Sequence, residues 1–141
     1  MSILRRPRRN KALRTVAVTT GEPAGIGPDL CTDLLDFAPR GCRVVLIGDR
    51  SVFGRARPRR ARKLQLPDFD ATVPARAGVE LLHVPLAVPA EPGRLNTANA
   101  RYVLETLDAA IGGGAARAVK SVVPRAVEKS LLNDAPVAFT R

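Results

Sequence analysis

The segment at residues 21–30, GEPAGIGPDL, constrains the fold more than any other part of this chain. It follows a β-branched run at residues 15–20 that is typical of a buried strand. Gly27 and Pro28 then open a helical pattern, since proline is favoured in the first turn and Asp29 complements the positive end of the helix dipole. A strand, a tight loop and a helix N-terminus in this order direct backbone N–H groups toward whatever lies over the loop.

Hydrophobic periodicity along the rest of the chain predicts an α/β fold with a mostly parallel sheet flanked by helices. We expect strands at residues 15–20, 43–48, 79–84 and 119–123 and helices at 27–37 and 96–111, with a short helix after Asp49, loop at 64–78 and a further helix beginning at 130–132. Strands that alternate with helices imply βαβ units. Aromatic residues make up only 4% of the chain, so the core must consist of aliphatic side chains.

Each long helix has an apolar stripe that predicts its buried face. For the first helix the stripe consists of Leu30, Leu34, Leu35 and Phe37. For the second it consists of Ala100, Val103, Leu104, Leu107, Ala110 and Ile111. Asn96 is the expected N-cap of the second helix, and Arg101 and Glu105 are spaced to form an ion pair on its polar face.

The chain of 141 residues has the size of one domain or of a piece of a larger one. We expect a basic disordered tail at residues 1–14 and a folded portion at 15–141. No element closes the sheet after residue 141, which indicates the N-terminal portion of a longer fold whose second half is missing.

A net charge of +10 raises a second hypothesis, a non-catalytic basic module that binds nucleic acid. The charge gathers in two clusters free of acids, at residues 5–14 and 55–63. No aromatic side chain interleaves with these arginines to stack bases, so we favour a solvated tail and an exposed helix end and do not expect nucleic-acid binding.

Metal and membrane sites find little support in the sequence. Cys31 and Cys42 do not form a CxxC pair, and His83 has no carboxylates at metal-ligand spacing, so we predict a structural role for His83 and no metal site. No apolar run reaches the length of a membrane span. The basic N-terminus is not followed by the apolar segment that a signal peptide requires. We therefore expect a cytoplasmic protein.

Four segments resemble the 4-hydroxythreonine-4-phosphate dehydrogenase family of pyridoxal phosphate (vitamin B6) biosynthesis. They are VAVTTGEPAGIGPDL at 16–30, VVLIGDRSVF at 44–53, PGRLNTANARYVLETLDAAI at 92–111 and VEKSLLNDAPVAFT at 127–140. They occur in the family's order and together span nearly the whole chain after the tail. The first and third are the most specific.

The resemblance implies part of a fold similar to isocitrate and isopropylmalate dehydrogenases, with an interdomain active site and a homodimer. It also implies an oxidoreductase that uses NAD and a divalent metal. Family members oxidise 4-phosphooxy-L-threonine, a phosphorylated small molecule, and the β-keto acid product loses its carboxylate to give 3-amino-2-oxopropyl phosphate. The metal would act as a Lewis acid, and the hydride chemistry would belong to the nicotinamide.

The same resemblance implies cleft-lining roles for Glu22, Lys129, Asn133 and Asp134. The substrate and metal histidines of the family lie beyond Arg141, so we expect no catalytic residue in this chain and no activity from it alone. The glycine loop has the spacing G-x-x-x-G-x-G, which is not the dinucleotide fingerprint, although Asp49 lies near the position of a ribose-binding acid. We therefore expect neither NAD nor metal to be bound by this portion.

Overall fold

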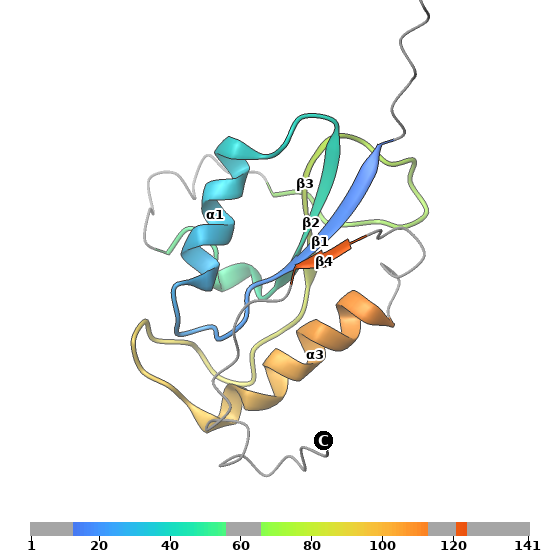
Figure 1. The fold of residues 1–141 in the computed structure, drawn as a ribbon. Helices are drawn as coiled ribbons and strands as arrows, with labels where there is room; N and C mark the ends of the chain where they lie inside the picture. Colours follow the sequence, from blue (N-terminus) through green and yellow to red (C-terminus); the bar gives the residue numbers. More distant parts are fainter. Residues whose placement is uncertain (1–12, 56–65, 113–120, 124–141) are drawn as a thin grey trace, which may run out of the picture.

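The computed structural model of the protein describes residues 13–55, 66–112 and 121–123 (Figure 1). Four strands form one sheet in the order β3-β2-β1-β4, and every neighbouring pair is parallel. The elements are β1 (Arg14–Thr19), α1 (Gly27–Phe37), β2 (Cys42–Gly48), the 3-10 turn η1 (Arg50–Val52), β3 (Gly78–His83), the 3-10 turn η2 (Thr97–Asn99), α3 (Ala100–Ile111) and β4 (Ser121–Val123). The predicted α/β class and parallel sheet are confirmed.

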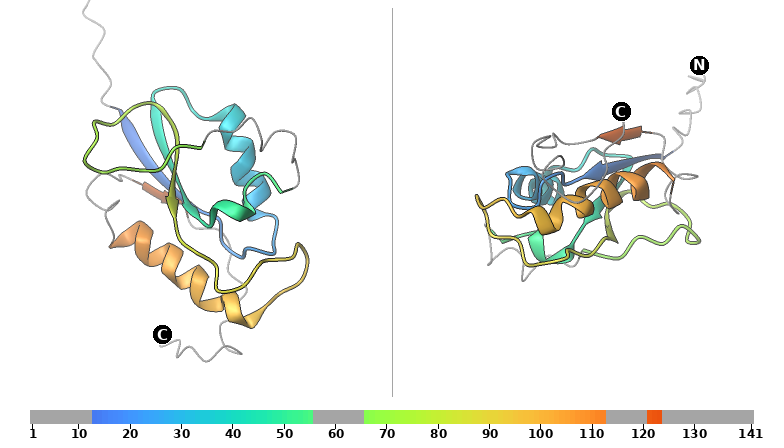
Figure 2. Two further views of the ribbon diagram at one scale, coloured as in Figure 1. Left: turned by 180° about the vertical axis from the view of Figure 1, so that it is seen from behind. Right: turned by 90° about the horizontal axis from the view of Figure 1, so that it is seen from below.

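The two helices cover opposite faces of this sheet (Figures 1 and 2). Side chains alternate between the faces along a strand. On β2, Val45 and Ile47 pack in the cluster that contains α3 residues, while Val44 and Leu46 pack with Cys31 of α1. All four of these β2 side chains are almost fully buried. A central strand buried on both faces explains why residues 43–48 form a nearly continuous apolar run.

The predicted buried face of α1 is confirmed only in part, since Leu34 and Leu35 pack against the core whereas Leu30 and Phe37 do not. Leu30 is 37% exposed and Phe37 is 75% exposed, while Leu34 and Leu35 are only partly buried. The helix instead buries small residues near its start, namely Gly27, Pro28, Cys31 and Thr32. Small side chains let the start of the helix approach the sheet closely, while Leu30 and Phe37 are left exposed.

The predicted face of α3 is rotated in a similar way. Ala100, Val103 and Ala110 are buried as expected, but Ile111 is 70% exposed. Tyr102 and Thr106 are buried although neither belongs to the apolar stripe. The helix also begins later than predicted, because Asn96 caps the turn η2 through the N–H of Ala98 and α3 starts only at Ala100. The predicted pair of Arg101 and Glu105 is confirmed, at 3.1 Å.

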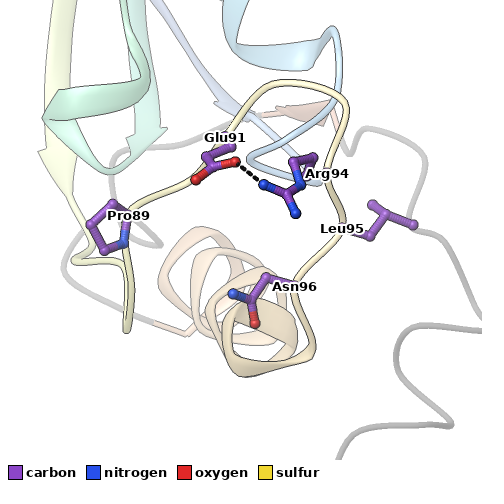
Figure 3. Close-up of a pocket in the computed structure, with 5 residues that line it drawn as sticks. All are labelled: Pro89, Glu91, Arg94, Leu95 and Asn96. Carbon is purple, nitrogen blue, oxygen red and sulfur yellow. Dashed lines mark hydrogen bonds and ion pairs between the residues drawn. The ribbon is translucent and has the colours of Figure 1, made fainter.

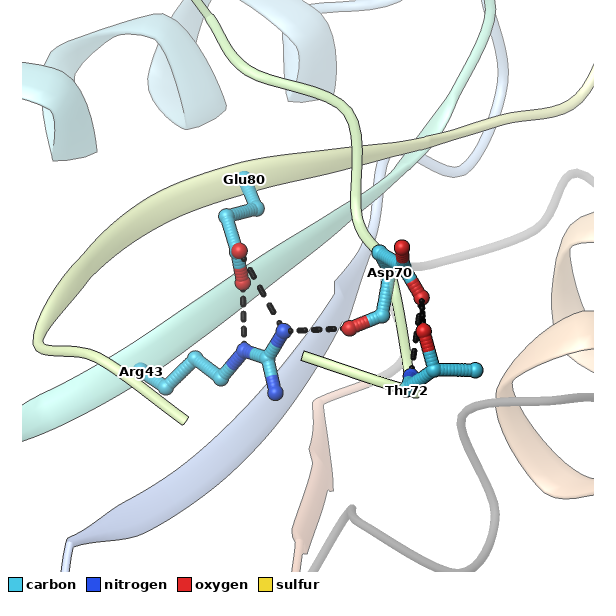
Figure 4. A network of polar contacts seen from close by, with 4 residues as sticks. All are labelled: Arg43, Asp70, Thr72 and Glu80. Carbon is cyan, nitrogen blue, oxygen red and sulfur yellow. Dashed lines mark hydrogen bonds and ion pairs between the residues drawn. The ribbon is translucent and has the colours of Figure 1, made fainter. Parts of the chain in front are cut away.

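A buried arginine fastens the edge strand β3 to the sheet (Figure 4). Arg43 of β2 is 2% exposed and forms an ion pair with Glu80 of β3. Its guanidinium also donates to the carbonyl of Asp70 at 3.0 Å and lies over the ring of Phe69. The segment after the undescribed residues 56–65 is thereby held against β3. Sequence inspection had assigned Arg43 only to a strand.

Several predicted features lie outside the described residues, including the helix at 130–132, nearly all of the tail at 1–14 and the start of the strand predicted at 119–123. Arg14 is the exception, since it begins β1. Of the two basic clusters, only Arg14 and Arg55 are described. Where the structure describes the chain, no helix combines the length and hydropathy that a membrane span requires.

Candidate functional site

The sheet topology singles out one edge as the candidate site. From β1 the chain proceeds to β2 and β3 on one side, whereas β4 pairs with β1 on the other. The order therefore reverses between β1 and β4, and ligands of open α/β sheets bind outside the carboxyl ends of the strands at such a switch point. The glycine loop at residues 20–26 leaves β1 at this position, and α1 begins directly after it.

Most carbonyl groups of the glycine loop are held within the protein. Gly21 starts the loop with a φ of 70°, a conformation that favours glycine. The five consecutive carbonyls of residues 22–26 each accept a hydrogen bond. The guanidinium of Arg55 donates to the carbonyls of Pro23 and Gly25. Backbone N–H groups bond the other three: Gly25 donates to Glu22, Gly93 to Ala24, and Asp29 and Leu30 to Ile26. The loop is thus fixed from α1, from the segment after η1 and from the segment before α3.

Glu22 is the one predicted cleft residue that the structure describes. Its Oε1 accepts from the N–H of Ala24 at 3.1 Å, while its Oε2 is buried without a hydrogen-bond partner in the described part of the chain. Burial raises the pKa of the Glu22 carboxyl, and the hydrogen bond from Ala24 opposes this only in part. The carboxyl therefore holds a proton more tightly than an exposed glutamate does. Lys129, Asn133 and Asp134 lie outside the described residues.

Replacing Glu22 with glutamine should stabilise the protein at neutral pH and not in acid. The folded pKa lies above the ordinary value, so the folded state loses stability as pH rises from that value through the raised one. Glu22→Gln keeps an oxygen for Ala24 and removes the buried charge. Because Glu22 is only half-buried, we expect thermal melts to show a gain of about 1–3 °C at neutral pH. At about pH 4 the Glu22 carboxyl is largely uncharged in both the folded and the unfolded protein. An equal gain at that pH would contradict the removal of a buried charge as the cause.

Tyr102 ties the carboxyl ends of β1 and β2 to α3. Its hydroxyl lies 3.2 Å from the hydroxyl of Thr20 and accepts from the N–H of Asp49 at 2.9 Å. Burial raises the pKa of the Tyr102 hydroxyl, although its hydrogen bonds with Thr20 and Asp49 lower it. The prediction of site residues missed Tyr102. Its signal was that it is the single tyrosine of an aromatic-poor chain.

Asp49, at the end of β2, is occupied by backbone and side-chain donors. Its carboxylate accepts from the N–H of Ser51 at 2.8 Å, from the hydroxyl of Ser51 at 2.6 Å and from the N–H of Leu86 at 2.8 Å. Burial alone would raise the pKa of Asp49, but these hydrogen bonds and the charge of His83 outweigh it and lower the pKa. The carboxylate therefore organises η1 and the segment after β3.

His83 ends β3 with its side chain exposed, and its Nδ1 accepts from the N–H of Arg50 at 3.2 Å. This contact holds η1 beside β3. Among the described residues, no group of three or more His, Cys, Asp or Glu side chains could hold a metal ion. In the described part of the chain, neither Cys31 nor Cys42 forms a disulfide.

A small open pocket of about 290 Å³ lies in the segment that connects β3 to α3 (Figure 3). Pro89, Glu91, Arg94, Leu95 and Asn96 line it. The N–H of Gly93 in the same segment donates to the carbonyl of Ala24 at 2.8 Å, so the pocket borders the glycine loop. Glu91 and Arg94 pair with one another at 2.8 Å across its rim.

Comparison with known proteins identifies the family. The family model described as "Pyridoxal phosphate biosynthetic protein PdxA" matches residues 40–141, which is more than half of the chain. The chain belongs to the PdxA family. The glycine loop precedes the matched range and β2, η1, β3 and α3 lie within it, so the described edge of the sheet is part of the PdxA fold.

Curated relatives extend this similarity to nearly the whole chain. A 4-hydroxythreonine-4-phosphate dehydrogenase of Chromobacterium violaceum is 48% identical over 126 residues, covering 89% of this chain and 38% of the relative. One of Aromatoleum aromaticum is 44% identical, covering 92% of this chain and 39% of the relative. The chain therefore spans well under half the length of these PdxA relatives.

Solved structures show the same fold. A 4-hydroxythreonine-4-phosphate dehydrogenase of Klebsiella pneumoniae superposes with a TM-score of 0.67 at 21% identity, covering 89% of this chain and 41% of the other. A terephthalate 1,2-cis-dihydrodiol dehydrogenase of Burkholderia xenovorans LB400 superposes with a TM-score of 0.65 at 26% identity, covering 89% and 38%. Both neighbours are dehydrogenases, as the resemblance in the sequence implied.

Proposed function

We propose that this chain forms the N-terminal portion of a 4-hydroxythreonine-4-phosphate dehydrogenase. The complete enzyme would oxidise 4-phosphooxy-L-threonine with NAD and a divalent metal, and decarboxylation would yield 3-amino-2-oxopropyl phosphate. The observation that carries the proposal is the 48% identity over 89% of the chain to a relative with this name. A homodimer in the cytoplasm is part of the same proposal.

The described residues support a positioning role more than a chemical one. The carboxylate of Asp49 is already occupied by donors of the protein, and the described residues present no set of metal ligands. No set of ligands among the described residues fits a divalent metal, and we assign no chemical step to these residues. We propose that Glu22, Lys129, Asn133 and Asp134 line the cleft in which a phosphorylated substrate binds.

Enzyme assays of the chain alone and of the reassembled protein test this function. The chain alone, given 4-phosphooxy-L-threonine, NAD and a divalent metal, should produce no NADH. The chain co-expressed with the segment of the Chromobacterium violaceum relative that follows the matched region should produce NADH that depends on substrate and metal. Turnover by the chain alone would contradict the assignment of a positioning role, without a chemical step, to this portion. A well-folded, inactive complex would contradict the proposed function.

The structural neighbour from Burkholderia xenovorans supports a second candidate substrate class. Its 26% identity and TM-score of 0.65 are comparable with those of the Klebsiella pneumoniae enzyme. The complex described above should therefore be offered a terephthalate cis-dihydrodiol beside 4-phosphooxy-L-threonine. We expect the phosphorylated substrate to be preferred, because identity to the curated relatives is much higher.

We predict that the chain does not bind nucleic acid. Several described arginines are paired with acids, including Arg43 with Glu80 and Arg50 with Asp68. Most of the basic clusters lie outside the described residues. A binding measurement at several salt concentrations tests the hypothesis, since affinity for phosphates falls steeply with salt.

A further inference from the structure

We propose that Arg55 is a positioning residue that fixes the conformation of the glycine loop at the switch point of the sheet. The sequence placed Arg55 only in a solvated basic cluster. That the ordered loop serves a dehydrogenase rests on the proposed function. That Arg55 orders the loop stands on the contacts of this chain and can be tested without substrate.

The guanidinium of Arg55 binds the loop at two places and the first turn of α1 at a third. It donates to the carbonyl of Pro23, and it donates to the carbonyl of Gly25 at 2.8 Å. Its Nε lies 3.8 Å from Oδ1 of Asp29 in the first turn of α1. The Arg55 side chain is only 14% exposed, so these contacts are largely shielded from water.

A separate set of backbone contacts positions Arg55 beside the glycine loop. Gly54 turns the chain with a φ of 72°, and its N–H donates to the buried hydroxyl of Thr32 at 3.0 Å. That hydroxyl donates in turn to the carbonyl of Pro28 at 2.9 Å. The segment after η1 is therefore anchored on α1 directly beside the loop, and Arg55 has a fixed base from which to reach it.

Arginine suits this position better than lysine. Its planar guanidinium offers several N–H donors in a rigid fork, so one side chain reaches two carbonyls that point to the same side. An ammonium group is a single compact charge on a flexible stem. Asp29 balances the charge of Arg55, so the loop does not carry an unpaired buried cation.

The loop has other attachments in the described part of the chain, and none of them replaces Arg55. At its end, the carbonyl of Ile26 accepts from the N–H groups of Asp29 and Leu30. The N–H of Gly93 donates to the carbonyl of Ala24, and Oε1 of Glu22 accepts from the N–H of the same residue. Both hold Ala24, whereas Arg55 alone bonds the carbonyls of Pro23 and Gly25 on either side of it. Removal of Arg55 would therefore free the flanks of the loop. Binding sites need such supports, because misplaced groups lose affinity.

Hydrogen exchange of the full chain tests the proposal. In Arg55→Ala, the amides of Ala24 and Gly25 should exchange about 10- to 100-fold faster, since charge-assisted hydrogen bonds hold the loop closed. The amides of β2 from Val44 to Ile47 should exchange as in the unsubstituted protein. Arg55→Lys should recover only part of the protection, and millimolar guanidinium should restore protection to Arg55→Ala.

Arg94→Ala is the matched control, because Arg94 pairs only with Glu91 at an exposed site near the same loop. It should leave the exchange of Ala24 and Gly25 unchanged. The proposal is overturned if Arg55→Ala leaves loop exchange unchanged, or if the loop and β2 accelerate by the same factor, which would mean global destabilisation. Absence of dehydrogenase activity in the reassembled protein would refute the proposed function and leave the exchange result standing.

Discussion

Replacing Gly48 with alanine should lower the free energy of unfolding by about 3 kcal/mol, because it overpacks a closed site and disturbs buried hydrogen bonds. A Cβ at this position would lie 2.7 Å from the hydroxyl oxygen of Tyr102 and 3.0 Å from that of Thr20. Neither hydroxyl can move freely, since Tyr102 also accepts from the N–H of Asp49. Urea denaturation of the variant measures the loss.

A double-mutant cycle identifies the cause of this loss. Tyr102→Phe removes the nearest atom, so Gly48→Ala should cost less in that background, with a coupling energy of about 1 kcal/mol. Gly112→Ala is the matched control, because the one described atom that its new Cβ would meet is the carbonyl oxygen of Asp108, at 3.6 Å. It should change stability by less than about 0.5 kcal/mol. Additive costs in the cycle would contradict a clash with Tyr102.

Replacing Arg43 with alanine should destabilise the protein by about 3 kcal/mol, the range for breaking a buried ion pair. The variant leaves the carboxylate of Glu80 without its partner, removes the donor to the carbonyl of Asp70 and uncovers the ring of Phe69 (Figure 4). Because Arg43 is 2% exposed, water cannot readily replace these contacts. Chemical denaturation measures the loss.

Arg101→Ala provides the comparison for Arg43→Ala. Arg101 also pairs with a glutamate, Glu105, but its side chain is 79% exposed. Such a pair along a helix contributes about 0.3–0.5 kcal/mol, so Arg101→Ala should have little effect. Equal losses in the two variants would show that burial does not determine the strength of the Arg43 pair.

Secondary structure and family were accessible from the sequence because their signals are local. The strand at residues 43–48 was predicted from one apolar run, and the loop before α1 from its glycines and prolines. Patterns of this kind depend on backbone preferences and alternation over a few residues. The parallel sheet followed from the alternation of strands and helices, and the family from four segments in order.

Other features depend on contacts between distant parts of the chain, and only the tertiary structure decided them. In α1, Cys31 and Thr32 are buried in place of Leu30 and Phe37, and the Thr32 hydroxyl accepts from the N–H of Gly54, 22 residues later. The local sequence around Arg43 and Arg55 does not distinguish these residues from solvent-exposed arginines. Their partners, Glu80 and the carbonyls of the glycine loop, lie about 30 residues or more away along the chain.

The sequence by itself determined where the strands and helices form, that the sheet is parallel, and that the chain belongs with the PdxA dehydrogenases. The tertiary structure alone decided that β4 pairs with β1, which creates the switch point, and that Tyr102 and Arg55 hold the loops there. The physical reason is the separation along the chain of the residues that interact. Propensity and periodicity act between neighbours, whereas hydrogen bonds and packing at the site join residues 30 to 82 positions apart.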